Sequence, residues 1–383
     1  MSKNLMECFS VVVDPRVDRR LKHRLIDILA IAVCGVLAGC NQWVEVVDFA
    51  ENRIDWFKTF LTLPNGIPSH DTFGRVFSIL DPESFQKAFY DWIGELRETL
   101  GPQIINIDGK FLNGSRREKG NSRSAIALVS AWATQAGVCL GQVKSELKKE
   151  QGEKRATEEL LNQLFIKGCI VTLDANGATP RITEKIVSKG GDYMIGLKLN
   201  QRALLRFAKN VFESTVRVAD YKTEERNHGR VEVREYWQAN LDSKECEKNS
   251  SLFSALRRKW PSIKSFVMVT STRIMNMVEK TETRYYFTSM QENAEQVAIA
   301  IRSHWAVENN LHWVLDVIFK EDESRVRMHH AAENFGLLRR MTLNILKKIN
   351  HPRDPKMSIN RKRNICNWNP DFLTKALFDA PKV

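Results

Sequence analysis

The sequence predicts a mixed α/β fold in which a helical front region precedes an α/β core that carries a β-rich insertion. Two observations predict this class. Residues 20–100 repeat apolar side chains every three to four positions, as amphipathic helices do. From residue 104 onward, short β-rich runs alternate with polar turns and helical stretches, which is typical of a sheet that packs against helices. A chain of 383 residues has room for two or three domains and a large core.

The front region, residues 1–98, is expected to form a small all-α domain. Its apolar stretch Ile28–Cys40 is too short to span a bilayer and predicts a buried helix. A second helix is expected to start near Ser69, with Ser69 or Asp71 as its N-cap. Short helices on either side of Gly66-Ile67-Pro68 could form a DNA-binding helix-turn-helix, although small helical domains are more often packing units.

The core is expected to span residues 99–350. Its first elements are strands at 104–107, 125–133 and 138–143, a helix at 157–165, a strand at 169–173, a helix at 180–188 and a strand at 193–197. The first three strands form an antiparallel meander, and helices connect the later ones. This is the order of a ribonuclease H-like core, in which the first and fourth strands are central neighbours.

An inserted β subdomain is expected at about residues 212–290. Its strand-like runs are 231–237, 266–270 and 284–287. A helix at about 293–319 and an amphipathic helix at 331–348 follow. Residues 351–383 are expected to form a basic C-terminal tail.

The charge of the chain indicates its partner. A net charge of +12 favours a polyanion. From Arg339 to the end there are eleven Lys or Arg and three Asp or Glu. The run Arg361-Lys362-Arg363 in this segment predicts either contact with a DNA backbone or a solvated basic end.

The seven cysteines are scattered, and no pair has CxxC spacing, so neither a zinc ribbon nor a disulfide framework is expected. Several lie in apolar runs, as reduced core cysteines do. The first residues lack the apolar region of a signal peptide. We therefore expect a cytoplasmic protein with no membrane partner.

Three carboxylates carry the predicted chemistry. Asp108 and Asp174 each end an apolar strand, and Glu308 lies in the late helix. For any one of these residues alone, a structural role at a strand end or on a solvated helix face is favoured over a metal site. Together, on a basic chain, they predict a cage for two Mg²⁺ or Mn²⁺ ions that catalyse phosphoryl transfer. Asp108 is the expected bridging ligand, because ions ~3.5–4 Å apart need a shared carboxylate.

Other reaction classes lack their motifs. The sequence has no GxxxxGK[ST] phosphate loop, no GxSxG motif and no Cys–His arrangement. Neither a nucleotide cofactor nor a nucleophilic side chain is therefore expected.

The residues around Glu308 allow several interpretations. Arg302 and His304 are expected to hold phosphate oxygens near the metals. A zinc site from His304, Glu308 and His312 is an alternative, because these residues are spaced i, i+4 and i+8. Trp305 and Trp313 are expected in the core, with stacking on an unpaired DNA base as the alternative.

Several motifs extend this interpretation along the chain. They are residues 66–72, Ile107-Asp108-Gly109-Lys110, Leu173-Asp174-Ala175, Lys198-Leu199-Asn200-Gln201, His228-Gly229-Arg230, and a long block from Ile301 to Asp316 that continues in Glu321–Arg327. In these motifs the chain resembles the H-repeat-associated transposases, a group of DDE transposases encoded by bacterial insertion sequences. The resemblance covers nearly the whole length, and the last block is its most specific part.

The resemblance implies a ribonuclease H-like core with a β insertion, in which Asp108, Asp174 and Glu308 are the catalytic, metal-binding triad. It implies cleavage and strand transfer of double-stranded DNA at insertion-sequence ends, with a homodimer in the DNA complex. The expected DNA contacts are Arg302, His304, Lys198, Asn200, Arg230, Arg361, Lys362 and Arg363.

Some positions depart from the family pattern. Asn113, Thr179 and Gln151-Gly152-Glu153 stand where an arginine, a glutamine and Ser-Asn-Glu are usual. The three carboxylates are retained. Two alternatives therefore stay open: a ribonuclease H-like nuclease that cuts without joining, and a catalytically inactive DNA-binding protein derived from a transposase.

Overall fold

The computed structural model describes residues 5–17, 21–99, 101–116, 125–145, 152–213, 218–227, 229–242, 250–291 and 293–379. His228 of the His228-Gly229-Arg230 motif, Gln151, and residues 380–383 of the predicted tail lie outside this part.

The chain divides into two compact units that do not follow the linear order of the sequence. We call Met1–Leu100, Gly109–Ala156 and Glu308–Val383 the helical unit. We call Gly101–Asp108 and Thr157–Val307 the sheet unit. Strand β1 (Ile104–Leu112) and helix α7 (Gly152–Gln163) each begin in one unit and end in the other.

The helical unit is built around helix α14 (Ala331–Lys348), which is buried along nearly its whole length. It packs against α2 (Leu25–Leu37), α5 (His70–Ile79) and β3 (Val138–Ser145). The unit also contains α1 (Leu5–Ser10), α3 (Trp43–Glu51), α4 (Ile54–Phe57), α6 (Pro82–Thr99), β2 (Ile126–Ala133), α13 (Trp313–Val317), α15 (Ile359–Trp368) and α16 (Pro370–Phe378).

Local sequence explains several of these helices. Helix α2 is apolar on all sides, and nearly all of its residues are buried, as expected for a helix in the middle of a core. Ser69 caps α5, because its Oγ accepts a hydrogen bond from the Thr72 amide at 3.4 Å. The prediction of a buried helix near Ile28–Cys40 is confirmed, and of the two predicted caps, Ser69 and Asp71, the structure has Ser69.

The sheet unit combines parallel and antiparallel strands. Strand β1 pairs in parallel with β4 (Ile170–Leu173), which pairs in parallel with β5 (Asp192–Gly196). Strand β5 pairs with β9 (Val278–Thr288), and an antiparallel meander continues through β8 (Ser265–Met275), β7 (Arg230–Asn240) and β6 (Tyr221–Asn227). The unit's helices are α8 (Pro180–Ser188), α9 (Arg202–Glu213), α11 (Ser250–Lys259) and α12 (Ala294–Val307).

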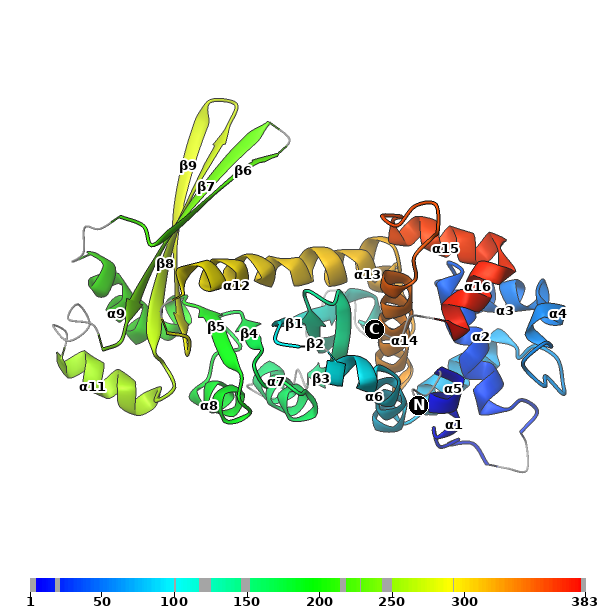
Figure 1. The fold of residues 1–383 in the computed structure, drawn as a ribbon. Helices are drawn as coiled ribbons and strands as arrows, with labels where there is room; N and C mark the ends of the chain where they lie inside the picture. Colours follow the sequence, from blue (N-terminus) through cyan, green and yellow to red (C-terminus); the bar gives the residue numbers. More distant parts are fainter. Residues whose placement is uncertain are drawn as a thin grey trace. The chain divides into compact units, whose positions relative to one another are not determined.

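The observed strand order is β3-β2-β1-β4-β5-β9-β8-β7-β6. The mixed α/β class is therefore confirmed, and the β3-β2-β1-β4-β5 part fits the predicted ribonuclease H-like order. The β6–β9 strands lie inside the predicted insertion at about 212–290, and the β6–β7 and β8–β9 hairpins extend past α12 (Figure 1). Strand β6 was not predicted, because Tyr221–Asn227 contains no aliphatic residue.

The C-terminal segment is not a tail over its described residues. It forms α15 and α16, and Cys366, Leu373 and Leu377 within them are buried. Six of the seven cysteines lie in the described part, and all six are free and buried. No described helix combines the length and the apolar character needed to cross a membrane.

Candidate active site

Asp108 lies within β1, and Asp174 directly follows β4, the neighbouring parallel strand of the sheet unit. The register pairs Asn106 of β1 with Thr172 of β4, and each of these residues lies two positions before an aspartate. The Asn106 Nδ2 atom donates to Thr172 Oγ1 at 2.7 Å, so these two side chains lie on the same face. Because side chains alternate in direction along a strand, Asp108 points to that face as well, and Asp174 begins the loop that follows β4.

The loop after β4 fixes Asp174. Its Oδ1 accepts hydrogen bonds from the Asn176 and Gly177 amides, at 2.8 and 3.1 Å. Its Oδ2 lies 3.8 Å from Lys198 Nζ. Asn200 Nδ2 donates to the Ala175 carbonyl at 2.7 Å. Lys198 and Asn200 were both predicted to contact DNA. Lys198 lies beside the carboxylate of Asp174, and Asn200 stabilises the loop that carries Asp174.

His304 on α12 bonds to the strand that precedes Asp174. Its Nδ1 lies 2.9 Å from Thr172 Oγ1. Burial lowers the pKa of His304, and the nearby Asp174 carboxylate only partly opposes this effect. The hydrogen bond joins α12 to β4, and the expected contact of His304 with a phosphate stays a prediction.

Glu308 directly follows α12 and begins a π-helical segment, Glu308–His312. Such segments are short interruptions of α-helices and are frequent at functional sites. The Glu308 carboxylate is largely exposed, and its Oε2 lies 3.1 Å from Nδ1 of the buried His312. Burial lowers the pKa of His312, and the hydrogen bond with Glu308 opposes this.

The zinc alternative is not supported. It required one regular helix from His304 to His312, and the π-helical segment breaks that spacing. Among the described residues, no metal-binding group joins His304 to Glu308 and His312.

A buried charge network surrounds Lys110 in the helical unit. Lys110 Nζ donates to Asp316, and it lies 3.3 Å from Glu321 Oε2 and 3.1 Å from Asp322 Oδ1. Glu321 in turn pairs with Arg340 of α14 at 3.0 Å. The network ties the end of β1, two residues after Asp108, to the segment after α13.

The same segment closes on the turn after β1. Asn113 Nδ2 donates to Asp322 Oδ2 at 2.8 Å, and Arg327 Nε donates to the Gly114 carbonyl at 2.9 Å. A Cβ atom on Gly114 would lie 2.1 Å from the Ser324 carbonyl oxygen, so only glycine fits there. These contacts explain the specific Glu321–Arg327 motif, whose role the sequence did not reveal.

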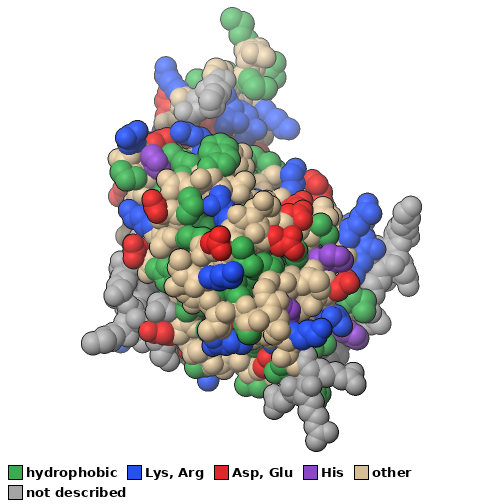
Figure 2. All heavy atoms as spheres, turned by 90° about the vertical axis from the view of Figure 1, so that its right-hand side faces the viewer, with side chains coloured by type: hydrophobic (Ala, Val, Ile, Leu, Met, Phe, Trp, Pro, Cys, Tyr) green, Lys and Arg blue, Asp and Glu red, His purple; other side chains and the backbone are tan. Residues whose placement is uncertain are grey.

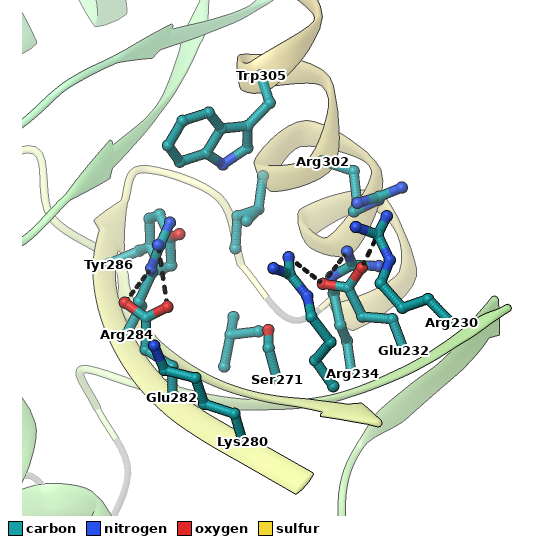
Figure 3. Close-up of a pocket in the computed structure, with 13 residues that line it drawn as sticks. Arg230, Glu232, Arg234, Ser271, Lys280, Glu282, Arg284, Tyr286, Arg302 and Trp305 are labelled. Atoms are coloured by element: carbon teal, nitrogen blue, oxygen red, sulfur yellow. Dashed lines mark hydrogen bonds and ion pairs between the residues drawn. The ribbon is translucent and has the colours of Figure 1, made fainter. Parts of the chain in front are cut away.

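The predicted DNA contacts Arg230 and Arg302 line one pocket of the sheet unit (Figure 3). Arg302 Nη2 lies 2.7 Å from Glu225 Oε1, and Arg230 Nη2 lies 3.8 Å from Glu232 Oε2. Charged residues alternate with other residues in Arg230-Val231-Glu232-Val233-Arg234 and in Lys280-Thr281-Glu282-Thr283-Arg284. That period of two was the signal from which more of this pocket could have been predicted.

The basic run of α15 corrects the predicted tail. Lys362 is buried and donates to the Leu346 carbonyl at 2.8 Å. Arg363 is buried and donates to the carbonyls of Val36, Cys40 and Ile318. Of this run only Arg361 is exposed, because helical geometry turns its two neighbours into the core. On the face drawn in Figure 2, the coloured acidic and basic side chains are interspersed.

The two tryptophans near Glu308 are not core residues, contrary to the prediction. Trp305 and Trp313 are each 53% exposed. The Arg284 guanidinium lies 5.3 Å from the centre of the Trp305 ring. Both rings therefore lie at the surface of their units.

Comparison with known proteins identifies the family. The family described as Transposase DDE domain matches residues 99–345, and the family described as DDE_Tnp_1-associated matches residues 6–93. The chain therefore belongs to the DDE transposase family.

Individual relatives agree with this assignment. "Putative transposase YncI" of Escherichia coli O157:H7 is 37% identical over 100% of this chain and 96% of its own length. "H repeat-associated putative transposase YhhI" of Escherichia coli K12 is 34% identical over 98% of each chain. The resemblance to the H-repeat-associated transposases is thus confirmed. "Inactive transposase YbfQ" of the same strain is 41% identical over 20% of this chain and 90% of its own length.

Among solved structures, the piggyBac transposase synaptic complex with hairpin DNA matches with a TM-score of 0.45 and 11% identity. The match covers 99% of this chain and 82% of that one. A likeness of this size does not establish a shared fold.

Proposed function

We propose that this protein is a DDE transposase that cleaves and joins the DNA ends of its insertion sequence, with Asp108, Asp174 and Glu308 as its catalytic carboxylates. The main support is the position of Asp108 on β1 and of Asp174 directly after β4, the neighbouring parallel strand. Glu308 supports it further, because it stands at the start of a π-helical segment and exposes its carboxylate.

The donor set fits two Mg²⁺ or Mn²⁺ ions. Carboxylate oxygens are the ligands that these hard cations prefer. His312, the partner of Glu308, is a further candidate ligand. When bound, the ions would activate the attacking hydroxyl and stabilise the charge on the leaving oxygen.

The chain's own residues prepare this site. Two backbone amides hold the Asp174 carboxylate in one orientation. The His304–Thr172 hydrogen bond holds α12, which leads directly to Glu308, against β4, the strand that precedes Asp174. Lys198 adds a positive charge beside Asp174, where it can attract a DNA phosphate.

The proposed partner is double-stranded DNA at the insertion-sequence ends, bound by a homodimer. A net charge of +12 supports a polyanionic partner. Lys198, Arg230, Arg302 and Arg361 are the predicted contacts that combine a positive charge with a substantially exposed side chain, and we retain these four.

The test uses the full chain and a DNA fragment that carries its gene with the natural flanks. We expect cutting and joining that need Mg²⁺ or Mn²⁺, stop in EDTA, and fall by at least roughly 10²–10³-fold in Asp108→Asn. Asp55→Asn is the matched control, because Asp55 is almost fully exposed on a short helix. Full activity in EDTA or in Asp108→Asn would rule out the metal site.

The same assay separates the alternatives. Cutting without joining would identify a nuclease, and DNA binding without cutting would identify an inactive relative. One segment of the chain is similar to "Inactive transposase YbfQ", and this similarity is the reason to test for an inactive DNA-binding protein.

A further inference from the structure

A pocket of about 410 Å³ lies in the sheet unit, between the β6–β9 ribbon and α12. Figure 3 shows its charged side chains converging on one space from several elements. Six cations line it: Arg230 and Arg234 on β7, Arg273 on β8, Lys280 and Arg284 on β9, and Arg302 on α12. It includes none of the three catalytic carboxylates.

The charges on the two faces of the ribbon differ. Strand alternation and register place five cations and three carboxylates (Glu225, Glu232 and Glu282) on the pocket face. With Arg302 of α12, the pocket face carries a net charge of +3. The opposite face has two cations, Lys222 and Arg226, and three carboxylates, Glu224, Glu235 and Glu279. Its net charge is −1, so the excess of positive charge lies on the pocket face of the ribbon.

The three carboxylates orient the guanidinium groups without neutralising them all. Glu232 lies 2.5 Å from Arg234 and 3.6 Å from Arg273, oxygen to nitrogen. Glu282 accepts from Arg284 Nε at 2.9 Å. Donor groups are therefore fixed in place before any ligand arrives.

Arg234 is the most informative of these donors. Its side chain is only 9% exposed, and Figure 3 shows it pointing into the pocket. Its Nη1 lies 3.4 Å from Glu225 Oε1 but makes no hydrogen bond within the described part of the chain. A buried donor without a hydrogen bond costs stability, and an anionic ligand in the pocket would supply the missing acceptor.

We propose that this pocket binds phosphodiester groups of the DNA backbone and forms a second anchor, distinct from the catalytic carboxylates. The inference rests on the proposed function, which takes DNA as the polyanion and names Arg230 and Arg302 among its contacts. Planar guanidinium forks match phosphate oxygens in pairs. Cations that contact phosphates position the DNA without reading its sequence, so the pocket fixes the orientation of the bound DNA.

The experiment compares two double variants that remove equal charge from opposite faces of the ribbon. Arg273→Gln with Lys280→Gln changes a cross-strand pair on the pocket face. Lys222→Gln with Arg226→Gln changes the two cations of the opposite face. All four side chains are exposed, so thermal unfolding should remain close to that of the unmodified protein for both variants.

Binding of the full chain to a labelled DNA duplex is measured by fluorescence anisotropy in EDTA, over a range of salt concentrations. The slope of log affinity against log salt changes by about 0.9 for each phosphate contact. We expect the pocket variant to bind DNA more weakly and its slope to be shallower by the amount of about two phosphate contacts. The opposite-face variant should match the unmodified protein in both affinity and slope. Equal slopes for the two variants would overturn the pocket assignment.

Pyrophosphate distinguishes a free phosphate ligand from DNA. We expect it to compete with DNA for the unmodified protein and less for the pocket variant. If it raises the melting temperature of the unmodified protein alone while the DNA slopes of both variants are unchanged, the pocket is a small-anion site and the DNA assignment fails. Failure of the unmodified protein to bind DNA would overturn the proposed function as well. If the pocket variant binds DNA with the same affinity and salt dependence as the unmodified protein, only this inference is overturned.

Discussion

Glu321 and Arg340 form an ion pair from which solvent is fully excluded. Arg340 Nη1 lies 3.0 Å from Glu321 Oε1, and neither side chain has exposed surface. Arg340 also donates to Ser130 Oγ of β2 at 3.2 Å, and Lys110 Nζ lies 3.3 Å from the other oxygen of Glu321. Because water cannot replace any of these partners, each charge depends on the other.

We expect Arg340→Met to lower the free energy of unfolding by about 3–5 kcal/mol, because it leaves the Glu321 carboxylate buried without its main partner. Urea unfolding measures the change. Arg325→Met is the control, since Arg325 is exposed, and it should change stability by no more than about 0.5 kcal/mol. Equal midpoints for the two variants would show that the pair adds nothing to stability.

The same pair predicts how stability depends on pH. Burial raises the pKa of Glu321, but Arg340 and Lys110 outweigh it and lower the pKa from 4.5 to about 2. A carboxyl whose pKa is depressed by folding stabilises the protein above its unfolded pKa and loses this contribution as pH falls through the folded pKa. We therefore expect stability to fall more steeply between pH 4.5 and pH 2 in the unmodified protein than in Glu321→Gln. Urea unfolding over that pH range tests this, and parallel curves would contradict it.

Glu308 and Asp316 are expected to differ in their effect on activity. Glu308→Gln should abolish hydroxyl transfer, a loss of roughly 10²–10³-fold or more, with DNA-end binding near normal. Asp316→Asn should retain substantial activity, because Lys110 keeps Glu321 and Asp322 as partners at 3.3 and 3.1 Å. A strand-transfer assay with the reverse pattern would show that Asp316 is the third catalytic carboxylate.

Substitutions of Arg361 and Arg363 are expected to differ in their effect on the stability of the protein. Arg363→Ala removes the donor to three backbone carbonyls. At about 1–3 kcal/mol for each buried acceptor left unpaired, we expect it to destabilise the protein by at least about 3 kcal/mol. Arg361→Ala breaks only an exposed pair with Asp354 and should leave stability within about 0.5 kcal/mol. Thermal unfolding of both variants is the measurement, and a larger loss for Arg361→Ala would contradict the burial pattern.

Much of the local structure could be predicted from the sequence. Helices α8 and α14 match the predicted ranges 180–188 and 331–348, and Asp108 and Asp174 lie where their apolar runs predicted neighbouring strands. These features depend on hydrophobic periodicity and on residues that cap or end an element. Both are properties of a few consecutive residues, so they can be read without knowing the partner of each element.

Other features were decided only by tertiary structure. The same basic run places Arg361 in solvent and Arg363 in the core, and the sequence could not tell which side of α15 would be covered. Trp305 and Trp313 are half-exposed despite their apolar surroundings in the sequence. The Glu321–Arg340 pair and the pocket of six cations join residues from different elements. These long-range contacts decide whether a charged side chain is solvated, paired with an opposite charge or placed beside a charge of the same sign. The free energy of a charge is set by its surroundings in space, which the linear sequence does not give.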